Sequence, residues 1–433
     1  MFKTIFLLAF LVGSCSAAQE KNFTAKAKKY STIKCLALCQ KKNPTVAKIG
    51  QMIKFDLEFT DQLDVDLKTS SQRPNKRALK KLFDQGISLC LLLKEKKDKT
   101  IYVHVKDTSS DTTVFKKTYP HSSESLVHEG HIIGNDLVPA LTGKPSVALS
   151  TLAFCKQLSS KQKIICVADY ACKSEKDLIT RNTLNVAPSW HSQEPMLFYS
   201  QFTQTRSRLM AFNMASKQQH NICAYNGLNM QPSFSPDGTQ VALCMSANSD
   251  NSEIYLYDQR LCAQLKKRVF KQLTHNNGNN SSPCLLPNGG LVFCSDFQTG
   301  NPQLYHLNRE TNKIRRLTNG QSYCAAPAYN AKKNALVYTR YINKNFQLFS
   351  MQLHEDRIVE KQLTFGPGDK IDPTWSTCGH YIAFTYDIKN EETGKKIPQI
   401  ATFNCDSRNI RVLTHDNFPK SFPAWTNTSL YQM

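Results

Sequence analysis

Short apolar runs and polar turns alternate along the chain from about residue 150 to its end, and one pattern among them recurs. A proline followed two residues later by a large apolar residue occurs six times, at intervals of 44, 51, 44, 46 and 50 residues. The six copies are Pro188-Ser189-Trp190, Pro232-Ser233-Phe234, Pro283-Cys284-Leu285, Pro327-Ala328-Tyr329, Pro373-Thr374-Trp375 and Pro423-Ala424-Trp425. Four of these prolines stand nine residues after the threonine of a Leu-Thr pair, namely Thr274, Thr318, Thr364 and Thr414. A constant offset of this kind indicates a repeated unit with a fixed corner.

Each repeat is predicted to form four short strands. Turn sequences follow two of the prolines, at Ser235–Gly238 and Leu286–Gly289, and both are favourable for hairpins. An apolar strand comes next, as in Gln240–Met245, and a third strand alternates, as in Glu253–Tyr257. Four strands per repeat with a period of 44–51 residues is typical of a β-propeller. We therefore expect a propeller of six blades.

A closed propeller also needs a strand that joins its two ends, because an incomplete blade leaves an open edge. Strand-like runs at Thr151–Cys155 and Ile164–Val167 precede the first copy of the proline pattern, and only eight residues follow the last copy. We expect Phe422–Thr426 to supply the innermost strand of the blade that begins near Thr151.

Residues 20–145 have a different pattern, in which apolar positions at helical spacing alternate with short apolar runs. Asn43-Pro44 has the chemistry of a helix start, and Gly143 that of a helix end. The predicted elements are strands at 31–39, 87–93 and 100–106 and helices at 44–57, 74–83 and 122–141. The predicted fold class is therefore a two-domain protein, with a small α/β N-terminal domain over residues 19–148 and an all-β six-bladed propeller over residues 149–433.

Residues 1–18 are predicted to be a signal peptide. Lys3 precedes an uncharged apolar run at Ile5–Val12, which is too short to span a bilayer, and Ser16-Ala17-Ala18 fits a cleavage site. A lipoprotein signal with a lipidated Cys15 is the less favoured alternative. No later stretch reaches 18 uncharged apolar residues, so we expect no transmembrane segment in the mature chain and export to the periplasm.

Composition limits the class of protein further. The 433 residues are 40% hydrophobic and 10% aromatic, which excludes a disordered or collagen-like chain. The net charge of +21 indicates either a solubilising surface or an anionic neighbour such as an envelope polymer or a membrane surface. Export argues against nucleic acid as that neighbour. The 15 cysteines have neither CxxC pairs nor zinc-ligand spacing, and most are expected to be unpaired core residues.

No catalytic, metal or cofactor site is predicted. Gly86–Cys90 lacks the final glycine of a nucleophile elbow, and His128-Glu129-Gly130-His131 is not the HExxH zinc motif. Gly143-Lys144 lacks the earlier glycine of a phosphate-binding loop. Two alternatives to a protein-binding scaffold stay open at this point: the regulatory propeller of an exported peptidase, and a propeller that binds a glycan or small ligand.

The combination of a signal peptide, a small α/β domain and a propeller with P-x-W/F and S-P-D-G repeats resembles the TolB family. Leu141–Lys144 followed by Leu152–Phe154 resembles the family's L-T-G and I-A-Y passage, and Val167–Tyr170 resembles its V-S-D-Y segment. The resemblance covers nearly the whole mature chain. It implies a non-enzymatic periplasmic scaffold of the Tol-Pal system, which supports outer-membrane integrity and envelope constriction during cell division.

The resemblance also implies partners and positions. The peptidoglycan-associated lipoprotein is the expected partner, and TolA is a second one through the mature N-terminal segment, although Gln19–Tyr30 shows no close match to that segment in the family. In the family, lipoprotein-contacting positions lie in the crossings that lead to each proline. Carried over by distance to the proline, and extended to neighbours on the same mouth of the channel, the expected lipoprotein-binding residues are Leu228, Gln231, Asn280, Ser281, Ser282, Asp372 and His415.

Overall fold

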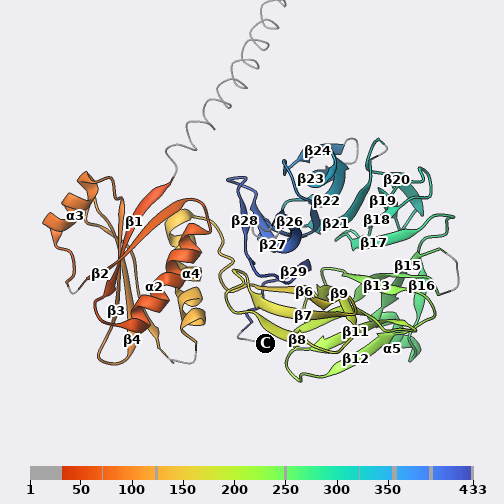
Figure 1. Cartoon of the computed structure of the whole chain (residues 1–433), viewed down its shortest axis with the longest axis horizontal. Helices are drawn as coiled ribbons and strands as arrows, with labels where there is room; N and C mark the ends of the chain where they lie inside the picture. The colour runs from red at the N-terminus through yellow and green to blue at the C-terminus, as the bar shows by residue number, and fades with distance from the viewer. Residues whose placement is uncertain are drawn as a thin grey trace, which may run out of the picture. The chain divides into compact units, whose positions relative to one another are not determined.

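The computed structural model describes residues 32–430, except residues 71, 122–124, 248–250, 321, 354–357 and 390–393 (Figure 1). The predicted signal peptide, Cys15 and the segment Gln19–Tyr30 lie outside the described residues. The chain divides into two compact units, with the boundary between Ala148 and Leu149. In the described residues, no helix is both long and apolar enough to cross a membrane.

The N-terminal unit is built on a five-stranded sheet of order β2-β1-β3-β4-β5. Its strands are β1 (Ile33–Gln40), β2 (Leu63–Ser70), β3 (Leu89–Glu95), β4 (Thr100–Asp107) and β5 (Thr113–Pro120). The pairs β1–β2 and β1–β3 are parallel, and the remaining pairs are antiparallel. The α/β character predicted from the sequence is confirmed, and β2 and β5 are additional strands.

Helices α2 (Pro44–Glu58) and α4 (Leu126–Thr142) cover one face of this sheet, while α3 (Lys76–Asp84) lies on the other (Figure 1). Asn43 caps α2 by accepting from the backbone N–H of Val46, and Gly143 ends α4 in the left-handed conformation. The two covering helices pack closely because α4 presents glycine to its neighbour: a Cβ on Gly134 would lie 2.0 Å from a carboxylate oxygen of Asp56.

The second unit is an all-β propeller with one eight-stranded and four four-stranded sheets. The large sheet holds β6 (Thr151–Ser159), β7 (Gln162–Asp169), β8 (Lys176–Ile179), β9 (Leu184–Trp190), β10 (Met196–Phe202), β11 (Ser207–Asn213), β12 (Gln219–Cys223) and β29 (Lys420–Thr426). The others are β13 (Asn229–Phe234), β14 (Gln240–Met245), β15 (Glu253–Asp258) and β16 (Phe270–Gln272); β17 (Asn280–Leu285), β18 (Leu291–Ser295), β19 (Gln303–Asn308) and β20 (Lys313–Arg316); β21 (Cys324–Asn330), β22 (Ala335–Ile342), β23 (Asn345–Leu353) and β24 (Ile358–Gln362); and β25 (Lys370–Trp375), β26 (Tyr381–Lys389), β27 (Lys396–Asn404) and β28 (Ile410–Val412). A short helix, α5 (Gln259–Leu265), joins β15 to β16.

The strands that carry the proline pattern form the inside of the propeller. Neighbouring members of the series β9, β13, β17, β21, β25 and β29 contact one another, and β29 contacts β9, so that the series closes on itself. We call these six the inner strands. The C-terminal strand β29 pairs antiparallel with β6, with Trp425 opposite Leu152, which confirms the predicted closing strand.

The Leu-Thr pairs are the fixed corners that their spacing indicates. At each of the four, the threonine Oγ1 accepts from the backbone N–H of a third-strand residue; the residues are Ile254, Leu304, Leu348 and Ile400. Thr318 and Thr364 also donate to glutamines on the same strands, Gln303 and Gln347, at 2.7 and 2.9 Å. Each corner therefore attaches the loop after the fourth strand to the third strand.

The described cysteines are free, and all except Cys172 and Cys405 are buried. Their expected role as small core residues is confirmed for Cys244 and Cys294, which belong to the apolar clusters between sheets.

Candidate partner-binding site

A backbone distortion repeats at the residue before each proline of the inner strands. These six residues have positive φ angles between 49° and 56°: Ala187, Gln231, Ser282, Ala326, Asp372 and Phe422. Non-glycine residues rarely adopt this conformation, and a following proline normally favours extended backbone. All six inner strands shift register against their neighbour at this point, as a β-bulge does. Six residues of one ring thus turn out of the regular pleat, and we call them the bulge ring.

The bulge ring borders a cavity of about 340 Å³ inside the propeller. From each bulge residue the lining continues through its proline to the next residue, and in four of the six strands it reaches the large apolar residue, as from Gln231 to Phe234. This is the second half of each inner strand, so the cavity extends away from the loops that lead into these strands. Among the predicted site residues, the structure places Gln231, Ser282 and Asp372 together on its wall.

Hydrogen bonds between neighbouring sheets hold the bulge ring in place. The backbone N–H of Ser282 donates to Gln231 Oε1 at 2.9 Å, and that of Gln231 donates to Ser200 Oγ at 3.3 Å. Opposite them, the N–H of Phe422 donates to Thr385 Oγ1 at 3.2 Å. The Gln231 side chain is therefore part of the ring's framework, because it satisfies a backbone donor that the bulge leaves without a ladder partner.

Asp372 is the acidic member of the bulge ring. It is half-buried, and Thr385 Oγ1 donates to its Oδ2 at 3.4 Å. Burial raises the pKa of the Asp372 carboxyl to about 7, and the hydroxyl of Thr385 and the charge of Lys163 oppose this only in part. The carboxyl consequently changes its charge close to neutral pH.

Replacement of Asp372 by asparagine should stabilise the protein at alkaline pH. The pKa of Asp372 in the folded state lies above the value of about 3.9 expected in the unfolded state. Between pH 4 and 7 the native state therefore binds the proton more tightly than the unfolded state does. The free energy of unfolding falls as the pH rises across this range, and the loss is complete once the pH exceeds the folded-state pKa. We expect Asp372→Asn to gain on the order of 1–2 kcal/mol relative to the parent at pH 8, since cavity water screens part of the shift, and little at pH 4. Thermal unfolding at both pH values measures this. The exposed carboxylate variant Glu310→Gln is the control, and an equal gain at both pH values would contradict the assignment.

The other four predicted residues lie elsewhere, so the seven do not form one cluster. Asn280 is fully buried, and its amide donates to Glu253 Oε2 at 2.9 Å and to Gly278 O at 3.2 Å. Ser281 is half-buried on β17 opposite Cys294. Leu228 and His415 are exposed on the loops that lead into β13 and β29. Asn280 holds its loop in shape, whereas Leu228 and His415 are available to a partner.

Exposed aromatic side chains gather on these same loops, and the sequence analysis did not identify them. Each such loop, which we call a crossing loop, joins the fourth strand of one repeat to an inner strand. Tyr225, Tyr323, Phe365 and Phe418 lie on four crossing loops and are 46%, 42%, 62% and 45% exposed. All crossing loops lead into the start of an inner strand, so they lie at the same end of the propeller. A plausible signal was present in the sequence, since an aromatic residue occurs within eight residues before the proline in each case.

One cluster in the propeller has the residue types of a metal site, but lysine side chains already pair with its carboxylates. Ligand atoms of Cys166, Glu175 and Asp177 lie within 4.8 Å of one another. Lys156 Nζ, however, lies 2.8 Å from a Glu175 oxygen and 2.7 Å from an Asp177 oxygen, and Lys420 Nζ approaches Glu175 to 3.6 Å. Two ammonium groups already balance the two carboxylates, so the cluster is an ion-pair network that connects β29 to β6 and to the segment around β8 within one sheet.

The side chains of the His128–His131 motif on α4 also form ion pairs with residues outside the motif. His131 Nδ1 lies 2.9 Å from Asp56 on α2, and Glu129 lies 2.6 Å from His121 Nδ1. The side chains of the motif thus connect α4 to two other segments.

Comparison with known proteins assigns the propeller to a family. A family model described as the TolB β-propeller domain matches residues 138–429, about two thirds of the chain. The chain belongs to the TolB β-propeller domain family. This confirms the resemblance seen in the sequence.

Curated relatives and a solved structure agree with the TolB assignment. The Tol-Pal system protein TolB of Helicobacter pylori (strain HPAG1) is 24% identical over 78% of this chain and 80% of its own. The protein of the same name from Francisella tularensis subsp. holarctica (strain OSU18) is 25% identical over 76% of this chain and 75% of its own. The crystal structure of TolB from Acinetobacter baumannii covers 91% of this chain and 96% of its own, with a TM-score of 0.75 at 19% identity, and so supports the fold.

Proposed function

We propose that this protein is a non-enzymatic scaffold of the Tol-Pal system, which binds the peptidoglycan-associated lipoprotein in the periplasm through its crossing loops. The relatives that cover about four fifths of the chain carry the name Tol-Pal system protein TolB. The observation that supports a protein-binding surface most is the set of exposed aromatic side chains at one end of the propeller. Tyrosine and other aromatic side chains are enriched in binding hot spots, and an exposed apolar patch commonly marks an interaction site.

The proposed surface consists of Tyr225, Leu228, Tyr323, Phe365, His415 and Phe418, and we call it the crossing-loop surface. Gln231, Ser281, Ser282 and Asp372 lie deeper, and Asn280 is enclosed beneath its loop. We assign these five a supporting role in which they fix the shape of the loops and of the bulge ring. A flexible partner segment that entered the channel from this end would pass the crossing loops first and then reach Gln231 and Asp372 on the cavity wall.

We further propose that the propeller has six blades. The eight-stranded sheet holds two sets of four strands, β29-β6-β7-β8 and β9-β10-β11-β12, and a single parallel bridge between Lys163 and Leu184 joins β7 to β9. Separated at this bridge, the sheet supplies two blades beside the four independent sheets. The closed series of six inner strands supports the same number.

We propose the following domain organisation and cellular location for a periplasmic Tol-Pal protein. Residues 1–18 would direct export and be removed, residues 19–148 would form the N-terminal domain, and residues 149–433 the propeller. TolA would be a second partner through the mature N-terminal segment. Neither a peptidase nor a glycan-binding role has a specific observation in its favour, and the Tol-Pal role therefore stands alone as our proposal.

Co-purification from envelope extracts tests this function. The full-length chain carrying an affinity tag should retain the peptidoglycan-associated lipoprotein of its own organism after washing, and purified lipoprotein should compete for it. A tagged chain with Phe365→Ala and Phe418→Ala should retain much less. If the lipoprotein is absent from the eluate while a peptidase or a glycan is retained in stoichiometric amount, the proposed function is wrong.

A further inference from the structure

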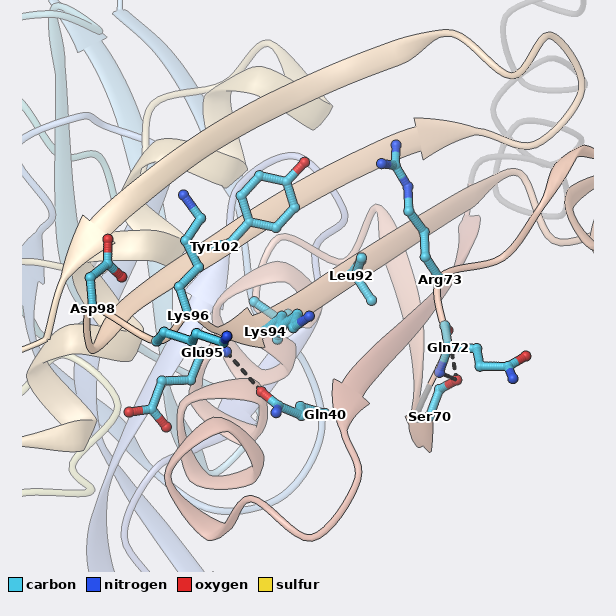
Figure 2. Close-up of a pocket in the computed structure, with 12 residues that line it drawn as sticks. Gln40, Ser70, Gln72, Arg73, Leu92, Lys94, Glu95, Lys96, Asp98 and Tyr102 are labelled. Atoms are coloured by element: carbon cyan, nitrogen blue, oxygen red, sulfur yellow. Dashed lines mark hydrogen bonds between the residues drawn. The ribbon is translucent and has the colours of Figure 1, made fainter.

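The N-terminal unit has a groove that the propeller-based function does not use. It has a volume of about 810 Å³ and lies along the ends of three strands of the sheet and the β3–β4 turn (Figure 2). The lining comes from Gln40 on β1, Ser70 on β2, the segment Leu92–Asp98, and Arg73 and Tyr102 nearby. All of these residues belong to one compact unit, so the groove does not depend on where the propeller lies.

Sheet topology places this groove where α/β folds bind ligands. Strands β2, β1 and β3 are parallel neighbours in that order, and Ser70, Gln40 and Glu95 are their last residues. The chain runs from β1 to β2 on one side and then returns past β1 to β3, so α2 and α3 lie on opposite faces (Figure 1). A change of direction of this kind opens a crevice at the carboxyl ends of the strands, which is the usual ligand position in open α/β sheets.

The groove carries a net positive charge. Arg73, Lys94, Lys96 and Lys97 line it. Elsewhere on the same sheet, Lys106 and Lys117 pair with Asp111 and Asp136. None of the four groove cations has a carboxylate within ion-pair distance among residues that the structure describes.

The two acidic residues of the lining are engaged by other groups. A Glu95 carboxylate oxygen accepts from Asn43 Nδ2 at 2.7 Å, and Asp98 Oδ1 accepts from the N–H and hydroxyl of Thr100 at 3.1 and 2.6 Å. These neutral donors leave both carboxylates charged, but the four cations of the lining outnumber them, so the groove presents a net positive charge to a ligand.

Arg73 is held in a defined position by a buried histidine. Its Nη2 donates to His104 Nδ1 at 3.2 Å, and His104 Nε2 donates to Thr113 Oγ1 at 2.9 Å. Burial lowers the pKa of His104, and the charges of Arg73 and Lys106 lower it further, so the ring is neutral and its Nδ1 can accept. A fixed guanidinium keeps its remaining N–H groups available for a carboxylate.

The floor of the groove is apolar, which limits the choice of ligand. Leu92 is half-buried beneath the cations, and the ring of Tyr102 lies beneath Lys96, with its centroid 5.4 Å from Nζ. A free phosphate or carboxylate ion would leave most of the volume unfilled, and a bare polyanion would place its charges on an apolar floor. The concave shape does not fit a membrane surface. A ligand with both carboxylates and apolar side chains matches the groove, because its carboxylates can face the cations while its apolar side chains contact the floor.

We propose that this groove binds an extended acidic peptide segment of a partner protein, with apolar side chains against Leu92 and Tyr102 and carboxylates toward Arg73, Lys94, Lys96 and Lys97. The binding is independent of the crossing-loop surface. It gives the protein a second docking surface, on the N-terminal unit, and accounts for part of its positive charge.

Fluorescence anisotropy with the full-length chain tests this proposal. The probe is a short fluorescein-labelled peptide in which glutamate alternates with leucine, and its lysine-for-glutamate counterpart is the sign control. We expect saturable binding of the acidic probe that weakens with added salt, and no binding of the basic one. Lys94→Glu and Lys97→Glu should each weaken binding about tenfold, and Leu92→Ser should also weaken it although no charge changes.

The charge-matched control is Lys48→Glu, an exposed lysine of α2, which covers the opposite face of the sheet. It should leave the affinity within about twofold, and Lys94→Glu should leave lipoprotein co-purification unchanged. Equal losses in Lys48→Glu and Lys94→Glu would show a general charge effect and overturn the proposal. Inorganic polyphosphate or anionic phospholipid vesicles that bind with the same dependence on Lys94 but no dependence on Leu92 would overturn it as well, in favour of a simple anion site.

Discussion

A chain that ends at residue 419 is expected to lose the folded propeller. The deletion removes β29, so that β6 and β9 both lose a neighbour and the series of inner strands opens. It also removes Trp425, whose Nε1 donates to Ser150 Oγ at 2.7 Å, and Lys420, which is fully buried beside Glu175. The loss involves several buried side chains and a row of strand hydrogen bonds, which is comparable with the whole stability of about 5–15 kcal/mol for a typical domain.

Thermal unfolding and limited proteolysis of the purified chain measure this effect. The N-terminal unit should keep its own transition, because it has a separate core. A chain that ends at Leu430 retains β29 and is the matched control, which should unfold like the parent. A chain ending at residue 419 that keeps a cooperative propeller transition at the parent temperature would show that β29 does not close the ring.

Trp190→Ala is expected to destabilise the propeller by about 3–5 kcal/mol, the usual cost of removing a large buried aromatic side chain. Trp190 packs in the apolar cluster that includes Ala153, Leu197 and Ala424. Its Nε1 donates to the backbone oxygen of Ala424 at 3.2 Å, so the side chain connects the first inner strand to the last. Trp190→Phe keeps most of the apolar contact and should cost less, with about 1 kcal/mol attributable to the lost hydrogen bond.

Denaturant-induced unfolding of the parent and both variants gives these differences. Leu261→Ala on α5 is a suitable surface control, because Leu261 is 39% exposed and its removal should change the free energy of unfolding by less than about 0.5 kcal/mol. If Trp190→Ala costs no more than Leu261→Ala, the contact between β9 and β29 does not contribute to the closure of the ring.

Much of the fold could be predicted because the propeller repeats its chemistry. The Leu-Thr pairs occur at a constant distance from the prolines since a threonine hydroxyl satisfies the same backbone N–H in each of these repeats. In the N-terminal unit, β2 and β5 were missed for a physical reason. Charged residues occupy half of Leu63–Lys68, and β5 is an edge strand with exposed lysines, so neither has the apolar run of a central strand.

The candidate site was less accessible to sequence reasoning. Distance to the proline correctly indicates which residues stand before an inner strand, but it does not distinguish a buried support such as Asn280 from an exposed side chain such as Phe365. The left-handed conformation of Gln231 and Asp372 also contradicts the local expectation for a residue before proline. That conformation accompanies a register shift between the inner strand and the next strand of its sheet, and the register of strand pairing is not encoded in any short window of the sequence.

A comparison of the two ends of the propeller tests most directly whether the crossing loops bind the lipoprotein. The affinity of purified peptidoglycan-associated lipoprotein is measured by calorimetric titration for Phe365→Ala/Phe418→Ala on the crossing-loop surface and for Leu261→Ala/Leu265→Ala on α5. The two pairs remove exposed apolar side chains, and α5 follows a third strand, so it lies at the end opposite the crossing loops. We predict that the first pair costs about 2 kcal/mol or more of binding free energy, roughly thirtyfold in affinity, and that the second stays within about twofold. Loss of binding in the α5 pair with the crossing-loop pair unaffected would place the lipoprotein at the opposite end of the propeller and contradict the proposed surface.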